Sequence, residues 1–149
     1  MFLKYCLETI RVLAEQKQTK AFVIFSAGFG EESEEGGKIE QEIVKVVNEN
    51  GASLIGPNCI GVLTDKYAGV FTTPVPKLDA NGCDFVSGSG ATAVFILSTA
   101  ISVGLKFSSI FSVGNRAQIG VEDVLQYWDE TFDPDKSSKV KLIYAEDIE

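Results

Sequence analysis

The sequence predicts an α/β fold in which amphipathic helices alternate with the strands of parallel sheets. Apolar residues recur at helical spacing in four segments, at 2–14, 39–50, 91–103 and 121–128. Short runs rich in β-branched and aromatic residues stand between these segments, and most of the runs end at glycine, serine or asparagine. This order is typical of parallel strands, because parallel neighbours need crossover connections and these are usually helices.

The composition fits a folded chain with an acidic surface. The 149 residues are 45% hydrophobic and 23% charged, which is enough apolar material for a real core. The net charge of −8 disfavours binding to nucleic acid, whose phosphates an acidic surface repels. Charges interrupt the apolar residues at the start of the chain, and no stretch suits a bilayer span, so we expect a cytoplasmic protein without a membrane partner.

The cysteines predict no metal or disulfide site. Cys6, Cys59 and Cys83 lie far apart, and the chain contains no histidine that could complete a zinc site. We therefore interpret them as reduced thiols that serve as small apolar residues.

In the first half, each segment justifies one element of a helix–strand–helix–strand order. The stripe at 2–14 predicts a helix with one apolar face, and 21–26 is an apolar run of strand length. Glycine and glutamate dominate 27–37, which predicts a loop. A second helix follows until Gly51 ends it, and 52–55 forms a short strand.

Proline and an Asn-Gly pair at 67–82 indicate a linker or domain boundary before the second half. Residues 83–87 predict a strand, and 88–90 a tight glycine turn. The helix at 91–103 is apolar nearly all round, so we expect it to be buried.

The remaining segments continue the same rhythm. A strand is predicted at 108–113, a helix at 121–128, a polar turn at 131–139 and a last strand at 140–144. Both ends look cut, because the first helix needs an earlier strand and the last strand needs a following helix. We therefore expect further chain on each side.

Four loops follow predicted strands, at 26–30, 56–59, 87–91 and 114–118. Ligands of open α/β sheets bind outside the carboxyl ends of the strands, so all four loops belong to the rim where a site would form.

The segment Ser87-Gly88-Ser89-Gly90-Ala91 is the best candidate for an anion site. A strand, two glycines and a buried helix would aim free N–H groups, two hydroxyls and the positive end of the helix dipole at one point. The alternative is an ordinary strand-to-helix turn with serine caps.

The other rim loops give weaker signals. The 56–59 loop is either a rigid ligand contact or an ordinary turn, and Cys59 lacks a histidine base that would make it a nucleophile. The acidic run at 31–35 predicts a solvated loop before a helix, with a divalent metal as a weakly supported alternative. The glycines do not form GxGxxG, so no dinucleotide fingerprint is present.

Taken together, the loops resemble one known family. The motifs are SAGFGE at 26–31, Gly36 and Glu40, IGPNCIG at 55–61, SGSGA at 87–91, SVGN at 112–115, VLQY at 124–127 and IYAE at 143–146. In this order they resemble the NDP-forming acyl-CoA synthetases. The ADP-forming acetyl-CoA synthetase alpha subunit is the nearer type, and the succinyl-CoA synthetase alpha subunit is more distant.

The resemblance implies a division of the chain and a reaction. Residues 1–75 would be the C-terminal half of a Rossmann-like CoA-binding domain, and 76–149 the N-terminal half of a flavodoxin-like ligase domain. The family interconverts acyl-CoA, phosphate and ADP or GDP with carboxylate, CoA and ATP or GTP through a phosphohistidine. Coenzyme A is thus the implied cofactor, and a small carboxylate the implied substrate.

The resemblance also implies parts that would lie outside the chain. These are a glycine-rich CoA loop before Met1, the catalytic histidine after Glu149, and an ATP-grasp beta subunit or domain that brings the magnesium nucleotide. The fragment alone would then be inactive, and an oligomer is possible.

Carried over position by position, the family assigns roles to three groups of residues and to Glu146. Phe25, Ser26 and Ala27 would contact CoA, and Gly56, Pro57, Asn58 and Cys59 would border its pantetheine end. Ser87, Ser89, Gly90 and Ala91 would present a helix N-terminus to phosphate. Glu146 matches the glutamate that supports the histidine, with an ordinary surface glutamate as the alternative.

Three positions depart from the family pattern. Gly88 stands where glutamine is usual, and Gln118 where an acidic residue is usual. The succinate enzyme has a tyrosine near Val94, so a dicarboxylate substrate is disfavoured. Two other functions stay open, because synthetase-like regions without turnover often lack the histidine. They are the synthetase-like regulatory region of a protein acetyltransferase and a non-catalytic CoA-binding module.

Overall fold

The computed structural model describes residues 2–146 and confirms the α/β prediction. The elements are α1 (Phe2–Lys17), β1 (Ala21–Val23), α2 (Glu34–Glu49), β2 (Ser53–Ile55), β3 (Gly61–Leu63), β4 (Ala68–Val70), β5 (Leu78–Ser87), α3 (Gly90–Ser102), β6 (Phe107–Ser112), α4 (Val121–Glu130) and β7 (Lys141–Tyr144). All four predicted helices are present, and so are the five predicted strands. β3 and β4 are additional to them.

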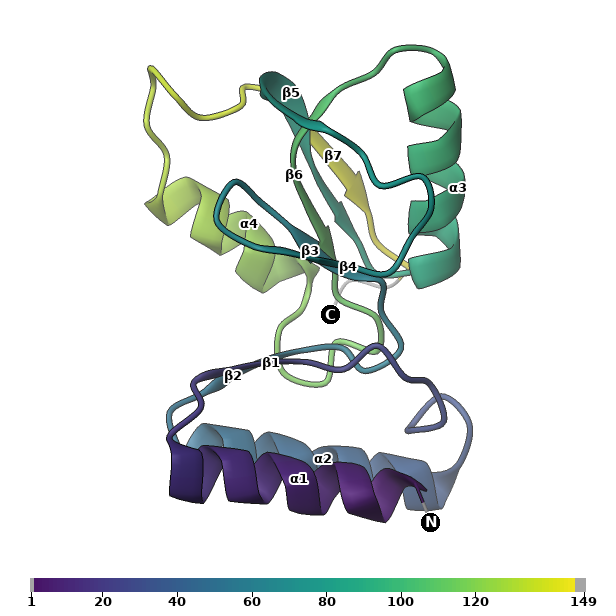
Figure 1. The fold of residues 1–149 in the computed structure, drawn as a ribbon, viewed down its shortest axis with the longest axis vertical. Coiled ribbons are helices and arrows are strands. Elements are labelled where there is room, and N and C mark those ends of the chain that lie inside the picture. Colours follow the sequence, from purple (N-terminus) through teal and green to yellow (C-terminus); the bar gives the residue numbers. More distant parts are fainter. Residues whose placement is uncertain (1, 147–149) are drawn as a thin grey trace.

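The first unit is a parallel pair of strands covered by two helices. β1 and β2 pair in register from Ala21 with Ser53 to Val23 with Ile55, and α1 and α2 lie side by side along one face of the pair (Figure 1). Leu7, Ile10 and Ile43 lie in one core with the strands. These buried positions recur at helical spacing, and this is the pattern that predicted the two helices from the sequence.

The second unit is a five-stranded sheet in the order β4-β3-β6-β5-β7, with α3 and α4 on opposite faces (Figure 1). Side chains alternate along β5, so Phe85 joins the cluster beneath α3 and Val86 joins the cluster beneath α4. β5 runs parallel to both β6 and β7, as predicted.

The sheet also contains two antiparallel pairings that the sequence did not indicate. β3 pairs with β4 and β6 in the antiparallel sense, so the second sheet is mixed. β4 and the start of β5 occupy part of the predicted linker at 67–82. The sequence did not predict β3 and β4 because each contains a glycine, and glycine has a low strand propensity. The structure requires glycine at position 61, since any side chain there would collide with the backbone of Gly69.

The division of the chain at residues 75 and 76 stays a prediction. On this topology the second unit would also include β3 and β4, which precede that position. Among residues 2–146 there is no helix that combines the length and the apolar character needed to cross a bilayer.

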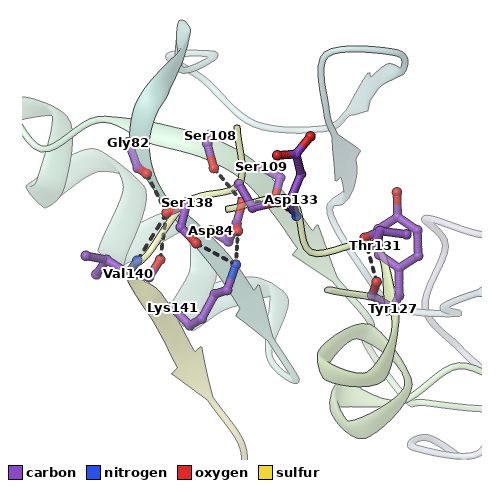
Figure 2. Close-up of polar contacts among 11 residues, drawn as sticks. Gly82, Asp84, Ser108, Ser109, Tyr127, Thr131, Asp133, Ser138, Val140 and Lys141 are labelled. Atoms are coloured by element: carbon purple, nitrogen blue, oxygen red, sulfur yellow. Dashed lines mark hydrogen bonds and ion pairs between the residues drawn. The ribbon is translucent and has the colours of Figure 1, made fainter. Parts of the chain in front are cut away.

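A polar network holds the amino ends of the three parallel strands together (Figure 2). The carboxylate of Asp84 on β5 accepts hydrogen bonds from the hydroxyls of Ser108 (2.5 Å) and Ser109 (2.6 Å) on β6. It also pairs with the ammonium of Lys141, its register partner on β7. The ammonium nitrogen of Lys141 lies 5.1 Å from the centroid of the Trp128 ring and donates to the carbonyl of Ser138 at 3.0 Å.

We expect the ion pair of Asp84 and Lys141 to contribute to the free energy of unfolding, because Asp84 is only 7% exposed. Lys141→Met leaves that carboxylate without its cation and should lower the free energy of unfolding by about 3 kcal/mol, the low end of the range for a buried pair, because the Lys141 side chain is 28% exposed. The double variant Asp84→Asn/Lys141→Met keeps an acceptor for both serines and should regain most of this loss. Urea unfolding measures both effects.

Lys139→Met is the control, because Lys139 is exposed on the neighbouring turn, and the expected change is within about 0.5 kcal/mol. A double variant as unstable as Lys141→Met alone would show that the carboxylate and ammonium are not coupled.

Candidate functional site

A cavity of about 380 Å³ lies where the carboxyl ends of β5, β6 and β7 meet the first unit. Its lining residues come from three of the four rim loops, from Glu31 directly after the fourth, from the first residue of α4 and from the segment after β7. They are Glu31, Asn58, Gly88, Ser89, Gly90, Ala91, Gly114, Asn115, Arg116, Val121 and Glu146. Three of the four predicted rim loops therefore meet at one cavity, and the fourth is joined to them by the hydrogen bond from the Asn58 N–H to the Ser26 carbonyl.

The turn before α3 uses part of its own hydrogen-bonding capacity. Ser87 is fully buried, and its hydroxyl donates to the carbonyl of Ser89 at 2.7 Å and accepts from the Ser89 N–H at 3.2 Å. The Ser89 hydroxyl caps the helix by accepting from the N–H of Thr92 at 3.4 Å. Ser87 thus shapes the turn from outside the cavity, while Ser89, Gly90 and Ala91 line it.

The first N–H groups of α3 are the donors best placed for a ligand. Gly90 and Ala91 are the first two residues of the helix, where the geometry of an α-helix provides no intrahelical acceptor. The positive end of the helix dipole lies at the same point. The N–H of Ser89 already donates to the hydroxyl of Ser87. Of the predicted anion donors, the N–H groups of Gly90 and Ala91 are therefore the ones that can still bind a ligand.

Glu146 lies where the sequence placed it. It follows the carboxyl end of β7, and its backbone nitrogen lies 3.8 Å from the point that a Cβ on Gly88 would occupy. The N–H of Gly88 donates to the carbonyl of Tyr144 at 2.9 Å, which ties the turn to this strand. Glu146 is exposed and lines the cavity, and its supporting role toward a histidine stays a prediction.

Of the 56–59 loop, Asn58 is the residue that reaches the cavity. Gly56 is buried at a φ of +94°, and a side chain there would meet the carbonyl of Ile24. Cys59 is 5% exposed, and burial raises the pKa of its thiol to about 11. This high pKa leaves little thiolate at neutral pH, which agrees with the expectation that Cys59 is no nucleophile.

The predicted CoA contacts at Phe25, Ser26 and Ala27 lie beside the cavity and do not line it. The carbonyl of Ser26 accepts from the N–H of Asn58 at 2.9 Å, so this loop and the 56–59 loop are joined. Phe25 is 41% exposed, and its ring centroid lies 6.3 Å from that of Phe71, which is 76% exposed.

The loop after β6 contributes more than the sequence indicated. Asn115 and Arg116 both line the cavity, although neither was assigned a role. The Asn115 side-chain amide donates to Oε2 of Glu31 at 2.5 Å and to Oε2 of Glu40 at 2.9 Å. Its own oxygen accepts from the Asn58 amide at 3.3 Å. Partners 57 to 84 residues away give no local sequence signal.

Glu31 is thus part of an ordered network within the predicted solvated acidic run. Partial burial raises the pKa of its carboxyl. The hydrogen bonds from Asn115 and from the N–H groups of Gly28 and Phe29 outweigh that effect, so the pKa lies below its usual value. The carboxylate is therefore ionised at neutral pH and accepts from both the loop and Asn115.

Gln118, at the end of the same loop, completes the free edge of β2. Its side-chain oxygen accepts from the Leu54 N–H at 2.5 Å, and its amide donates to Oδ1 of Asn48 at 2.6 Å and to the carbonyl of Ala52 at 3.2 Å. A carboxylate at this position could accept but could not donate, so the departure to glutamine has a structural use.

A larger cavity of about 820 Å³ lies at the opposite, amino end of the parallel strands. It borders the network of Asp84 and Lys141, and Figure 2 shows that these side chains bond to one another. Because their polar atoms already have partners and the rim loops lie elsewhere, the smaller cavity is the better candidate site.

The chain is similar in sequence and fold to known acyl-CoA ligases. Residues 80–149 match the family described as succinyl-CoA ligase like flavodoxin domain. The alpha subunit of acetate–CoA ligase [ADP-forming] II from Pyrococcus furiosus is 34% identical over 133 residues, which is 89% of this chain and 28% of that subunit. Acetate–CoA ligase [ADP-forming] I from Archaeoglobus fulgidus is 35% identical over 134 residues, which is 90% of this chain and 19% of that protein.

A solved structure shares the fold of the whole chain. It is the dinucleotide forming acetyl-coenzyme A synthetase 1 of Ca. Korarchaeum cryptofilum in complex with phosphate and ADP. Its TM-score is 0.85 at 28% identity, and the match covers 99% of this chain and 30% of that one. The chain therefore spans less than a third of the length of the relatives compared here.

Proposed function

This chain is a homologue of the NDP-forming acyl-CoA synthetases, and on that basis we propose that it is the CoA- and phosphate-handling part of such an enzyme. One observation carries the proposal, which is the cavity where the first turn of α3 meets loops from the first unit. The carboxyl edge of a sheet is where α/β proteins place their ligands.

In this proposal, phosphate binds the N–H groups of Gly90 and Ala91. A helix N-terminus favours an anion through its unpaired donors and its dipole. Arg116 is the basic residue among the lining residues and supplies a positive charge on the opposite loop. Glu31 and Glu146 are acidic, so this local positive charge matters for an anionic ligand.

CoA is proposed to lie along the adjoining rim. Phe25, Ser26 and Ala27 would contact it, and the loop from Gly56 to Cys59 would border its pantetheine end. The bond between Ser26 and Asn58 makes these two loops one surface, and Asn58 continues that surface into the cavity. The acyl thioester would then meet phosphate near the N-terminus of α3.

The proposed chemistry follows the family reaction. Phosphate attacks the acyl carbon, the thioester bond breaks, and acyl phosphate and CoA thiolate form. A histidine then takes the phosphoryl group and releases the carboxylate, and NDP accepts the group to give NTP. The chain contains no histidine, so another segment or chain supplies it, and Glu146 would orient its ring.

The nucleotide is proposed to arrive on an ATP-grasp subunit or domain, as its magnesium complex. The reaction uses soluble metabolites, so the cytoplasm is the proposed compartment.

The absence of histidine also supports a second candidate, a synthetase-like region that binds CoA without turnover. Such a region would be a regulatory part of a protein acetyltransferase or a CoA-binding module. The two candidates differ in ligands, because a synthetase part should bind phosphate and CoA together, whereas a regulatory part needs CoA alone.

The anion site is tested by removing one N–H group. Gly90→Pro deletes that donor, and the extended backbone of Ser89 (φ −122°, ψ 125°) suits a residue before proline. We expect inorganic phosphate to bind about tenfold more weakly, which is the value of one charge-assisted hydrogen bond. Two-dimensional NMR titration measures the dissociation constant.

Gly90→Ala is the matched control, because it keeps the N–H group and its Cβ would approach no atom closer than 3.5 Å. Equal phosphate affinities for the proline and alanine variants would place the anion elsewhere.

The chain alone should form no ATP. Phosphoryl transfer to ADP needs a nucleophile that is also a good leaving group near neutral pH, and histidine is the residue suited to this task. Incubation with acetyl-CoA, phosphate, magnesium and ADP should therefore give no ATP above the blank. Sustained ATP formation that copurifies with the chain through successive columns would contradict the proposed phosphohistidine route.

A further inference from the structure

Two carboxylates from different parts of the first unit meet at one amide of the second unit. Glu31 lies in the loop before α2, and Glu40 lies within α2. An ionised carboxylate can only accept hydrogen bonds. The side-chain amide of Asn115 donates one N–H to Glu31 at 2.5 Å and the other to Glu40 at 2.9 Å. Asn115 thereby bridges two like charges that would otherwise repel each other.

The same carboxylates hold the backbone of the loop at 28–30. Glu31 accepts from the N–H of Gly28 at 2.5 Å and from that of Phe29 at 3.2 Å. Glu40 accepts from the N–H of Gly30 at 3.3 Å. Three consecutive amides therefore point at carboxylates that Asn115 holds in place.

Asn115 is itself fixed to the other rim loop. Its N–H donates to the carbonyl of Pro57 at 2.9 Å, and its side-chain oxygen accepts from the Asn58 amide at 3.3 Å. The close approach of this loop requires Gly114, whose φ is +58° and where a side chain would collide with Pro57 and Asn58. Asn115 thus connects both loops of the first unit to the end of β6.

We propose that Asn115 is a positioning residue that holds the 28–31 and 56–59 loops opposite the N-terminus of α3, so that the two halves of the cavity keep their spacing. The inference deepens the proposed function and rests on it for the identity of the ligands. Asparagine suits the position because it donates to two carboxylates and accepts from an amide at once.

The test reverses the direction of one hydrogen bond. Asn115→Asp replaces the donor with a third carboxylate, which should repel Glu31 and Glu40 and release the loop. In Glu31→Gln/Asn115→Asp, the glutamine oxygen can still accept from Gly28 and Phe29, and its amide can donate to the new carboxylate at position 115. The double variant has the net charge of the wild type, so it separates geometry from charge.

Two readouts are followed. Hydrogen exchange of the Phe29 amide reports the loop without any ligand, and calorimetric titration with CoA in the presence of phosphate reports the site. Asn115→Asp should speed Phe29 exchange and weaken CoA about tenfold, as expected for the loss of a charge-assisted hydrogen bond. The double variant restores the bond to position 31 but leaves Glu40 facing the new carboxylate, so it should recover part of both losses.

Gln118→Glu is the control for general loosening of the loop. It removes the donor to Asn48 and Ala52 but leaves Asn115 in place, so it should lower the melting temperature without changing Phe29 exchange. If Asn115→Asp also lowers only the melting temperature, Asn115 is a structural residue and the positioning role is wrong.

The remaining outcomes separate the inference from the proposed function. If Phe29 exchanges as fast in the double variant as in Asn115→Asp, the inference is wrong even if CoA binds the wild type. The expected exchange pattern without CoA binding to any variant would support the positioning of the loop and overturn the CoA site.

Discussion

The structure depends on how the loop after β6 docks onto the first unit. Asn115 satisfies two carboxylates there, and Gln118 satisfies the edge of β2. These bonds accompany apolar contacts between the two units, since Ala117 packs against the core of the first unit and Ile55 of β2 packs against the cluster beneath α4. The outer edge of β2 has backbone N–H and carbonyl groups that no strand pairs with. The Gln118 side chain accepts from the Leu54 N–H and donates to the Ala52 carbonyl, as a further strand would.

The same docking explains where the cavity lies. Parallel strands direct their following loops to one edge, and the 114–118 loop brings the rim of the first unit against that edge. Glu31 and Glu40 of the first unit are not free charges in this arrangement, because both accept from backbone amides and from Asn115. An anionic ligand would therefore meet ordered dipoles as well as carboxylates, which makes a helix N-terminus at Gly90 a reasonable phosphate site on an acidic protein.

The sequence predicted the elements whose pattern is local. Helical stripes and apolar strand runs repeat within a few residues, so α1 to α4 and the parallel strands were readable. β3 and β4 were missed because glycine lowers strand propensity, whereas the close approach of the Gly69 backbone that requires glycine at position 61 depends on the tertiary fold. The rim loops were located correctly, but the inward role of Asn115 was not predictable, because its partners depend on tertiary contacts. The buried position of Ser87 is a similar case, since composition alone did not distinguish a turn-forming hydroxyl from a ligand donor.

The central claim is that one ligand site spans both units at the carboxyl edge. Amide chemical-shift mapping during titration of the chain with CoA and phosphate tests this claim most directly. The account predicts that shifts appear together in both units, at 25–27 and 58 on one side and at 88–91 and 115 on the other. Shifts confined to one unit, or clustered at 134–141 around the larger cavity, would contradict it.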